Sequence, residues 1–214
     1  MKYITVEMLK LAKGQRVWDI GNQCLYDLCS KYPVHNNIGE IIAKLTLIGR
    51  AYAAAIERRK NAKLSNDDFL VEKVCPEIKR SALDKKLCQL KELNKITLDN
   101  IPIILQTHKY LVDIFYELTS QQKRSLASKY LHFHLSHLFY LYDSRAYSGF
   151  RKILPGYRSQ ILVNFDANMY EIEYGKFFCK LFELNTKIHN EFGYDLTPRQ
   201  LDNVLLEINK PSYA

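Results

Sequence analysis

The chain of 214 residues is long enough to bury a hydrophobic core without disulfides or a structural metal ion, and its content of 47% hydrophobic and 25% charged residues is typical of a soluble globular protein. Charged residues interrupt the amino-terminal segment MKYITVEMLKLAKGQR, which argues against a signal peptide or a membrane span there and leads us to expect a cytoplasmic protein. The net charge of +8 favours a polyanionic partner such as nucleic acid, while five cysteines without a Cys-x-x-Cys pair argue against a zinc or iron–sulfur site, so we expect no cofactor.

Helical periodicity dominates the first half of the chain. Apolar residues three and four apart predict a helix over residues 17–32, closed by Pro33, and a long helix over residues 37–60 that ends in the basic segment IERRK. The polar residues 61–66 predict a loop. Because proline is tolerated in a first helical turn, Pro76 predicts the start of a third helix that reaches residue 93.

The second half continues this pattern. Helices are predicted over residues 102–118, 121–134, 169–189 and 199–209, the last with Thr197 and Pro198 as cap and first turn. Asp143 and Ser144 predict another helix start, because a short side-chain oxygen there accepts free backbone N–H groups. No alternating strand pattern is sustained along the chain, and the one short strand that the sequence predicts covers residues 160–165. We therefore predict an all-α protein of about nine or ten helices around a cleft. It would be a single domain over residues 1–214, or two lobes of about 1–95 and 96–214.

Titratable and aromatic residues concentrate in the segment SLASKYLHFHLSHLFYLYDSRA, residues 125–146. Here His132, His134 and His137 have the spacing H-x-H-x-x-H. Helical residues two apart point to different faces, so we predict core or interface histidines rather than a metal site. What remains is Lys129 near the start of one helix, a short apolar crossing, and Asp143 at the start of the next helix.

This order of parts resembles the helix-hairpin-helix DNA glycosylases of the endonuclease III and 8-oxoguanine glycosylase type. In that family a G-x-G-x-K-x-A-like segment begins the second hairpin helix, and a V-D-T-H-V-like segment presents the catalytic aspartate. SLASKYL and LYDSRA stand in those places here. The hairpin segment TSQQKRSLAS has none of the family's glycines, and Lys129 and Asp143 are closer together in the sequence than is usual. The resemblance implies a helix-hairpin-helix glycosylase-like fold and an enzyme that removes a flipped base from double-stranded DNA.

The resemblance also implies roles for particular residues. Asp143 would stabilise the positive charge that develops on the sugar during N-glycosidic hydrolysis. Lys129, if it lost its proton, would instead attack the sugar and form a Schiff base. Aromatic side chains would line the pocket for the extruded base, and flanking basic residues would bind phosphates. The candidates are Trp18, Tyr26, Tyr52, Phe139, Tyr140 and Tyr142 for the base, and Lys123, Arg124, Arg145, Arg151 and Lys152 for the phosphates.

Other interpretations of the same residues stay open. Asp143 also suits a helix cap without a catalytic role, Lys129 a solvated helix lysine, and the aromatic residues a core. At the level of function, the alternatives are a non-catalytic helical nucleic-acid-binding module and a protein-interaction domain in which the charge is incidental. The departures from the family pattern favour a specialised substrate. Removal of a modified base from phage DNA, and so antiviral defence, is a further hypothesis.

Overall fold

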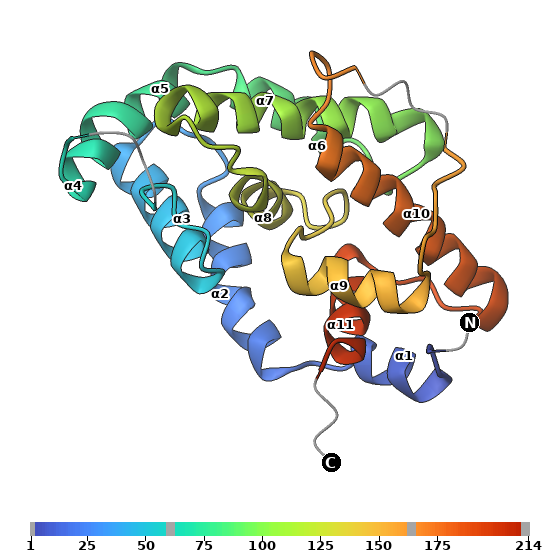
Figure 1. The fold of residues 1–214 in the computed structure, drawn as a ribbon. Coiled ribbons are helices and arrows are strands. Elements are labelled where there is room, and N and C mark those ends of the chain that lie inside the picture. The colour runs from blue at the N-terminus through green and yellow to red at the C-terminus, as the bar shows by residue number, and fades with distance from the viewer. Residues whose placement is uncertain (1–2, 59–62, 162–165, 211–214) are drawn as a thin grey trace.

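The computed structural model describes residues 3–58, 63–161 and 166–210, and every regular element among them is helical (Figure 1). The predicted all-α class is confirmed for these residues, and the predicted strand at 160–165 lies mostly outside them. A π-helical turn, Leu70–Val74, joins α4 (Asn66–Phe69) and α5 (Cys75–Arg80) into one continuous helix, and a short 3-10 helix, Leu98–Asn100, precedes α7 (Ile101–Thr119). The α-helices are α1 (Val6–Lys13), α2 (Val17–Lys31), α3 (Ile38–Ala51), α4 (Asn66–Phe69), α5 (Cys75–Arg80), α6 (Leu83–Lys91), α7 (Ile101–Thr119), α8 (Arg124–His134), α9 (Ser144–Ile153), α10 (Ile172–Phe192) and α11 (Pro198–Ile208).

Several helix ends follow the caps that the sequence contains. α2 and α7 match the predicted segments 17–32 and 102–118 closely. Thr197 caps α11 by accepting a hydrogen bond from the backbone N–H of Gln200, and Pro198 occupies the first turn. Asp143 caps α9 as predicted. The predicted helix over residues 76–93 is interrupted between α5 and α6, while α8 and α10 begin later than predicted.

The long helix predicted over residues 37–60 extends too far, because α3 ends just before Tyr52. Ala53 has a φ of 50°, and the backbone N–H of Ala54 donates to the Gly49 carbonyl at 2.7 Å. A hydrogen bond of this kind forms where the chain reverses its direction at the C-terminal end of a helix. Gly49 permits the reversal, since a Cβ there would lie 2.9 Å from the Cα of Ala55. Tertiary packing thus overrides the high helix propensity of this alanine-rich segment.

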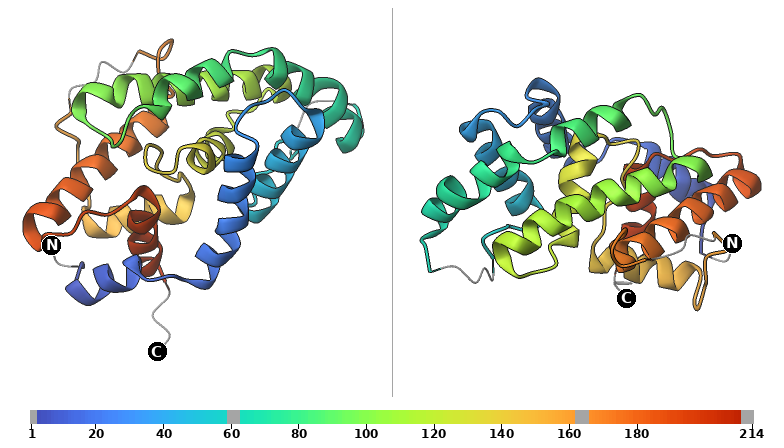
Figure 2. Two further views of the ribbon diagram at one scale, coloured as in Figure 1. Left: turned by 180° about the vertical axis from the view of Figure 1, so that it is seen from behind. Right: turned by 90° about the horizontal axis from the view of Figure 1, so that it is seen from above.

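The central element is α8, which is seen nearly end-on in the middle of Figure 1 and has α2, α3 and α7 packed against it. Both views in Figure 2 place α1, α9 and α11 toward one end of the molecule and α4 and α5 toward the other. One hydrophobic core connects these ends. Among the residues that the structure describes, no helix combines the length and apolar content needed to cross a bilayer.

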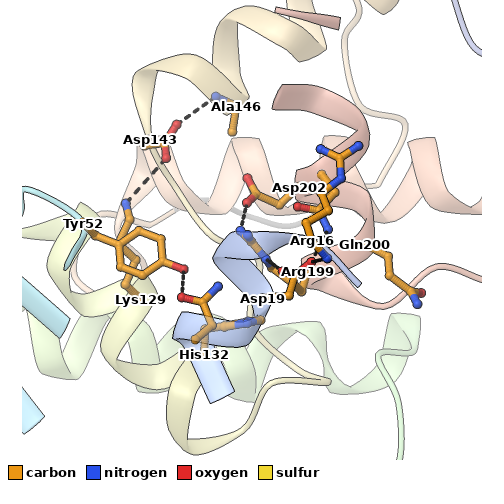
Figure 3. A network of polar contacts seen from close by, with 12 residues as sticks. Arg16, Asp19, Tyr52, Lys129, His132, Asp143, Ala146, Arg199, Gln200 and Asp202 are labelled. Carbon is orange, nitrogen blue, oxygen red and sulfur yellow. Dashed lines mark hydrogen bonds and ion pairs between the residues drawn. The ribbon is translucent and has the colours of Figure 1, made fainter. Parts of the chain in front are cut away.

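Helices α9 and α11 pack unusually closely. A Cβ on Gly149 of α9 would lie only 2.2 Å from the carbonyl oxygen of Leu205 in α11, so any side chain there would clash with backbone. α11 also contacts α1. The close packing brings Asp143, at the start of α9, toward Asp202 of α11 (Figure 3).

Candidate functional site

A pocket of about 380 Å³ opens where the start of α2, the turn after α3, the start of α9 and α11 meet. This volume falls in the range of small-molecule sites, roughly 300–1,000 Å³. Arginines, carboxylates and aromatic rings share its wall. The lining residues are Arg16, Trp18, Ala51, Tyr52, Ala53, Asp143, Arg145, Arg199, Asp202, Asn203, Leu206, Asn209 and Lys210.

A larger depression of about 980 Å³ lies beside α10. Its lining is mainly apolar and includes Leu98, Tyr157 and Phe182. The backbone N–H of Gln160 donates a hydrogen bond to the Oε1 of Glu183 in this depression, at 2.7 Å. Groups that can transfer protons or stabilise developing charge concentrate instead in the smaller pocket, which is therefore the candidate site.

Asp143 is fixed at the edge of this pocket by its position as the cap of α9. Its Oδ1 accepts the backbone N–H of Ala146 at 2.8 Å, and its Oδ2 lies 3.9 Å from the Nζ of Lys129. The side chain remains 25% exposed. Figure 3 shows both interactions on one carboxylate. The two residues that the sequence analysis singled out for chemistry therefore lie together, with Asp143 accessible from the pocket.

Lys129 lies behind Asp143 and is almost completely buried, with 1% of its side chain exposed. Its Nζ donates hydrogen bonds to the Ser125 Oγ at 2.8 Å and to the Tyr142 carbonyl at 2.7 Å. Burial lowers the pKa of Lys129 to about 8, although the negative charge of Asp143 opposes this shift. The interpretation of Lys129 as a solvated helix lysine is therefore wrong. At neutral pH the amine keeps its proton in most molecules.

A second carboxylate enters the pocket from α11. Asp202 is 4% exposed, and its Oδ2 accepts a hydrogen bond from the Nη1 of Arg199 at 2.6 Å. Burial raises the pKa of Asp202 to about 7, since the opposing effect of Arg199 does not compensate and the charge of Asp143 adds to the rise. The Nε of Arg199 also donates to the Oδ1 of Asp19 at 2.8 Å. Although burial opposes ionisation of Asp19, this contact contributes to a lowered pKa there. Arg199 thus bridges two carboxyl groups whose pKa values are shifted in opposite directions.

Two predicted base-pocket residues, Trp18 and Tyr52, line this pocket. The Tyr52 hydroxyl donates to the Oδ1 of Asn22 at 2.9 Å, and burial raises the pKa of Tyr52 to about 12, so the phenol stays neutral. Trp18 lies in the first turn of α2 and is 70% exposed. A large exposed indole beside a pocket offers a flat apolar surface on which a nucleobase can stack.

The other predicted base-pocket residues lie elsewhere. Phe139 and Tyr140 are buried in the hydrophobic core, so their assignment to a base pocket is wrong. The Tyr26 hydroxyl forms a 2.7 Å hydrogen bond with the Nε2 of His132. Tyr142 lines a separate depression beside the start of α8. The apolar crossing between α8 and α9 is therefore mainly a packing element.

The predicted phosphate-binding residues separate into two groups. Arg145 lines the pocket. Arg124, in contrast, forms an ion pair with Glu171 at 2.8 Å, and the Lys123 Nζ donates to the backbone carbonyl of Arg58. These two side chains hold the start of α8 against other parts of the chain, so internal contacts already occupy them.

Further basic side chains lie at or beyond the pocket rim. Arg151 and Lys152 are exposed in the last turn of α9. Arg16 and Lys210 line the pocket and both pair with Glu207, at 3.1 and 2.8 Å. Arg16 and Lys210 could not be identified from the sequence, because their place in the pocket depends on how distant parts of the chain pack together.

The three histidines of the segment have separate surroundings. The Nδ1 of His132 donates to the Phe139 carbonyl at 2.8 Å, and burial lowers the pKa of His132 to about 4. The Nε2 of His137 donates to the Leu93 carbonyl at 2.7 Å, and His134 lies against aromatic neighbours inside the fold. Within the described ranges, no cluster of three His, Cys, Asp or Glu side chains could hold a metal ion.

The contribution of α11 is the main feature that sequence analysis missed. Arg199 and Asp202 are three positions apart, so they lie on one helix face. A charged pair on the face that also carries Leu205 was the available signal, because a buried charge needs a partner and often marks a site. The sequence alone did not place that face beside Asp143.

A comparison with protein families, curated proteins and solved structures finds no match to this chain. The function of this chain is therefore inferred from the pocket and its chemistry.

Proposed function

We propose that this protein is a DNA glycosylase-like enzyme that hydrolyses the N-glycosidic bond of a modified or damaged base and leaves an abasic site. The observation that carries the proposal is the pairing of Asp143 with the buried Lys129, 3.9 Å apart, at the edge of a pocket lined by arginines and aromatic rings. An accessible carboxylate in a fixed position is the group that a positively charged, oxocarbenium-like transition state requires.

The contacts of Asp143 support this role. The hydrogen bond from Ala146 and the ammonium group of Lys129 hold its carboxylate from two sides. As the bond between the sugar and the base breaks, positive charge develops at the sugar carbon, and a negative charge below the sugar lowers the energy of that state. The same carboxylate can align a water molecule for attack on that carbon.

Hydrolysis is favoured over a Schiff-base mechanism. An attacking Lys129 amine would have to lose its proton and give up its hydrogen bonds to Ser125 and Tyr142, and it is 1% exposed. We therefore assign Lys129 as a positioning residue that orients Asp143 through charge.

The remaining pocket residues suit an extruded nucleotide. Trp18 and Tyr52 offer aromatic surface for the base, while Arg145 can contact a phosphate. The net charge of +8 adds a general attraction to DNA. A modified base in phage DNA remains our proposal for the substrate, with defence as the corresponding role.

The direct test is base release. The protein would be incubated with duplexes that each carry one damaged or modified base and with heavily modified phage DNA. Released bases are measured by mass spectrometry and abasic sites by alkaline cleavage. We expect release from at least one substrate. Salt-sensitive DNA binding without release would favour a non-catalytic nucleic-acid-binding module, and absence of both would favour a protein-interaction domain.

A further inference from the structure

The second carboxyl group of the pocket, Asp202, has an oxygen that its surroundings do not use. Its Oδ2 accepts the hydrogen bond from Arg199, whereas its Oδ1 is buried and has no hydrogen-bond partner among the described residues. Asp202 nevertheless belongs to the wall of the pocket. In Figure 3 a dashed line joins its carboxyl group to Arg199, and Asp143 lies to the left of it. A buried polar atom without a partner is costly, and one at a pocket wall is a candidate contact for a ligand.

The charges around Asp202 determine whether its carboxyl group is protonated near neutral pH. Arg199 and Lys129 favour the ionised form, whereas burial and the negative charge of Asp143 oppose it, and the balance raises the pKa to about 7. Because Arg199 donates to Oδ2, the proton of the neutral acid lies on Oδ1, the unoccupied oxygen. The titratable and charged groups near Asp202 are Arg199 on α11, Lys210 after α11, Arg16 before α2, Asp19 and Tyr26 on α2, Tyr52 after α3, Lys129 on α8, Asp143 at the cap of α9 and Arg145 on α9.

We propose that Asp202 is the general acid that protonates the departing nucleobase, a role that rests on the proposed glycosylase function. As the bond between the sugar carbon and the base nitrogen breaks, its electron pair goes to the base, and the base takes the proton from the Oδ1 of Asp202. Water then adds to the sugar carbon, and the proton that it loses restores the acid. No oxidant, reductant or further reactant is required, so the reaction is a simple hydrolysis.

This assignment gives the two pocket carboxyl groups different tasks. Asp143 is partly exposed and lies beside the cation of Lys129, so it suits the stabilisation of positive charge. Asp202 is buried and holds a proton near neutral pH, so it suits proton donation. Pairs of carboxyl groups whose environments separate their pKa values are a recurring arrangement for acid catalysis. The substrate class that follows is a base whose departure needs a proton.

The test compares bases whose departure from the sugar depends to different degrees on protonation by an acid. Duplexes would carry uracil or 5-fluorouracil, 5-hydroxymethylcytosine or 5-formylcytosine, and hypoxanthine or 7-methylguanine. In each pair the second base leaves more easily, and 7-methylguanine already carries a positive charge. For D202N we expect release of the first base of a pair to fall on the order of 100-fold, as for loss of a general acid, and release of the second to fall far less. The parent rate should decline above about pH 7, and the D202N rate should not.

A matched control uses the other carboxyl group bound to Arg199. D19N also disturbs this arginine but leaves the acid of Asp202 in place, so it should slow both bases of a pair by a similar factor. A separate arm follows the carboxyl carbons by NMR during a pH titration of the protein alone. We expect one signal with a midpoint near 7 that D202N lacks.

The outcomes separate the two proposals. If the parent releases a base and D202N slows both members of its pair equally, general acid catalysis by Asp202 is overturned while the glycosylase proposal stands. If no carboxyl group titrates near neutral pH, the acid assignment is overturned whatever the activity. If the parent releases no base from any duplex, both proposals fail together.

Discussion

Gly149 of α9 lies directly against the backbone of Leu205 in α11, at a distance that leaves no room for a Cβ, which would be 2.2 Å from the Leu205 carbonyl oxygen. Asp143 at the start of α9 and Asp202 on α11 both line the pocket, so we expect the pocket to depend on how closely the two helices pack. We therefore expect G149A to force the helices apart, lower the free energy of unfolding by about 1–3 kcal/mol as overpacking does, and reduce base release further than folding alone explains.

A second glycine provides the control for this prediction. Gly21 lies in the exposed face of α2, and a Cβ there would meet no heavy atom within 4 Å. G21A should therefore raise the free energy of unfolding by roughly 0.5–1 kcal/mol, because alanine favours a helix over glycine. Urea unfolding of both variants measures the contrast. Equal stabilities of G149A and the parent would contradict the close packing of α9 and α11.

Replacement of Lys129 separates hydrolysis from covalent catalysis. K129M keeps most of the side-chain volume but removes the amine that binds Ser125 and Tyr142. If Lys129 only positions Asp143, base release should persist within roughly tenfold of the parent, a loss of about 1.4 kcal/mol in transition-state stabilisation. Borohydride added to the parent with its substrate should trap no adduct. A trapped adduct that K129M abolishes would show that Lys129 is the nucleophile.

The basic residues should differ in their effect on DNA binding. Arg145 is exposed at the pocket, so R145A should weaken binding to all sequences and lower the slope of log K against log salt by about one unit. Arg124 is engaged by Glu171, so R124A should change the stability more than this slope. Arg80, an exposed arginine on the distant α5, is a control whose loss should change neither. If R145A and R80A gave equal slopes of log K against log salt, Arg145 would not contact DNA phosphates.

The raised pKa of Asp202 makes stability depend on pH. In the folded protein this carboxyl group keeps its proton up to about pH 7, whereas its ordinary pKa is 3.8. Between these values the folded state binds more protons than the unfolded state, so rising pH lowers the free energy of unfolding, by up to about 1.4 kcal/mol per pH unit.

The variant D202N lacks this titration. Relative to the parent, D202N should therefore gain stability as the pH rises from about 4 to 7, and the difference should stay constant above that range. Urea unfolding of both proteins at several pH values measures the difference. A difference that does not change with pH would indicate that Asp202 is ionised throughout.

Local features of the site could be predicted from the sequence, and long-range ones could not. Helix periodicity and capping predicted the helix of Lys129 and the cap of Asp143, and the resemblance to helix-hairpin-helix glycosylases singled out the two residues together. The assignment of Phe139 and Tyr140 to a base pocket was wrong because both side chains lie in the core. Apolar residues in a crossing segment fill the core, and sequence composition does not distinguish a core surface from a pocket surface.

The remaining errors arise from tertiary contacts. The alanine-rich segment after α3 has high helix propensity, yet it reverses at Ala53 because the chain packs over Gly49. This reversal places Tyr52 and Ala53 in the pocket wall. Asp202 is far from Asp143 in the sequence, and only the packing of α11 on α9 brings them together. Neither event has a local sequence signal strong enough to predict it.

The most direct test of the central claim is base release by D143N measured beside the parent. Asparagine caps helices about as well as aspartate, so the hydrogen bond to Ala146, the fold and DNA binding should be retained. Removal of the charge should lower release on the order of 100-fold or more, as loss of a transition-state electrostatic contact does. Release by a well-folded D143N at the parent rate would contradict the catalytic role and leave Asp143 as a helix cap alone.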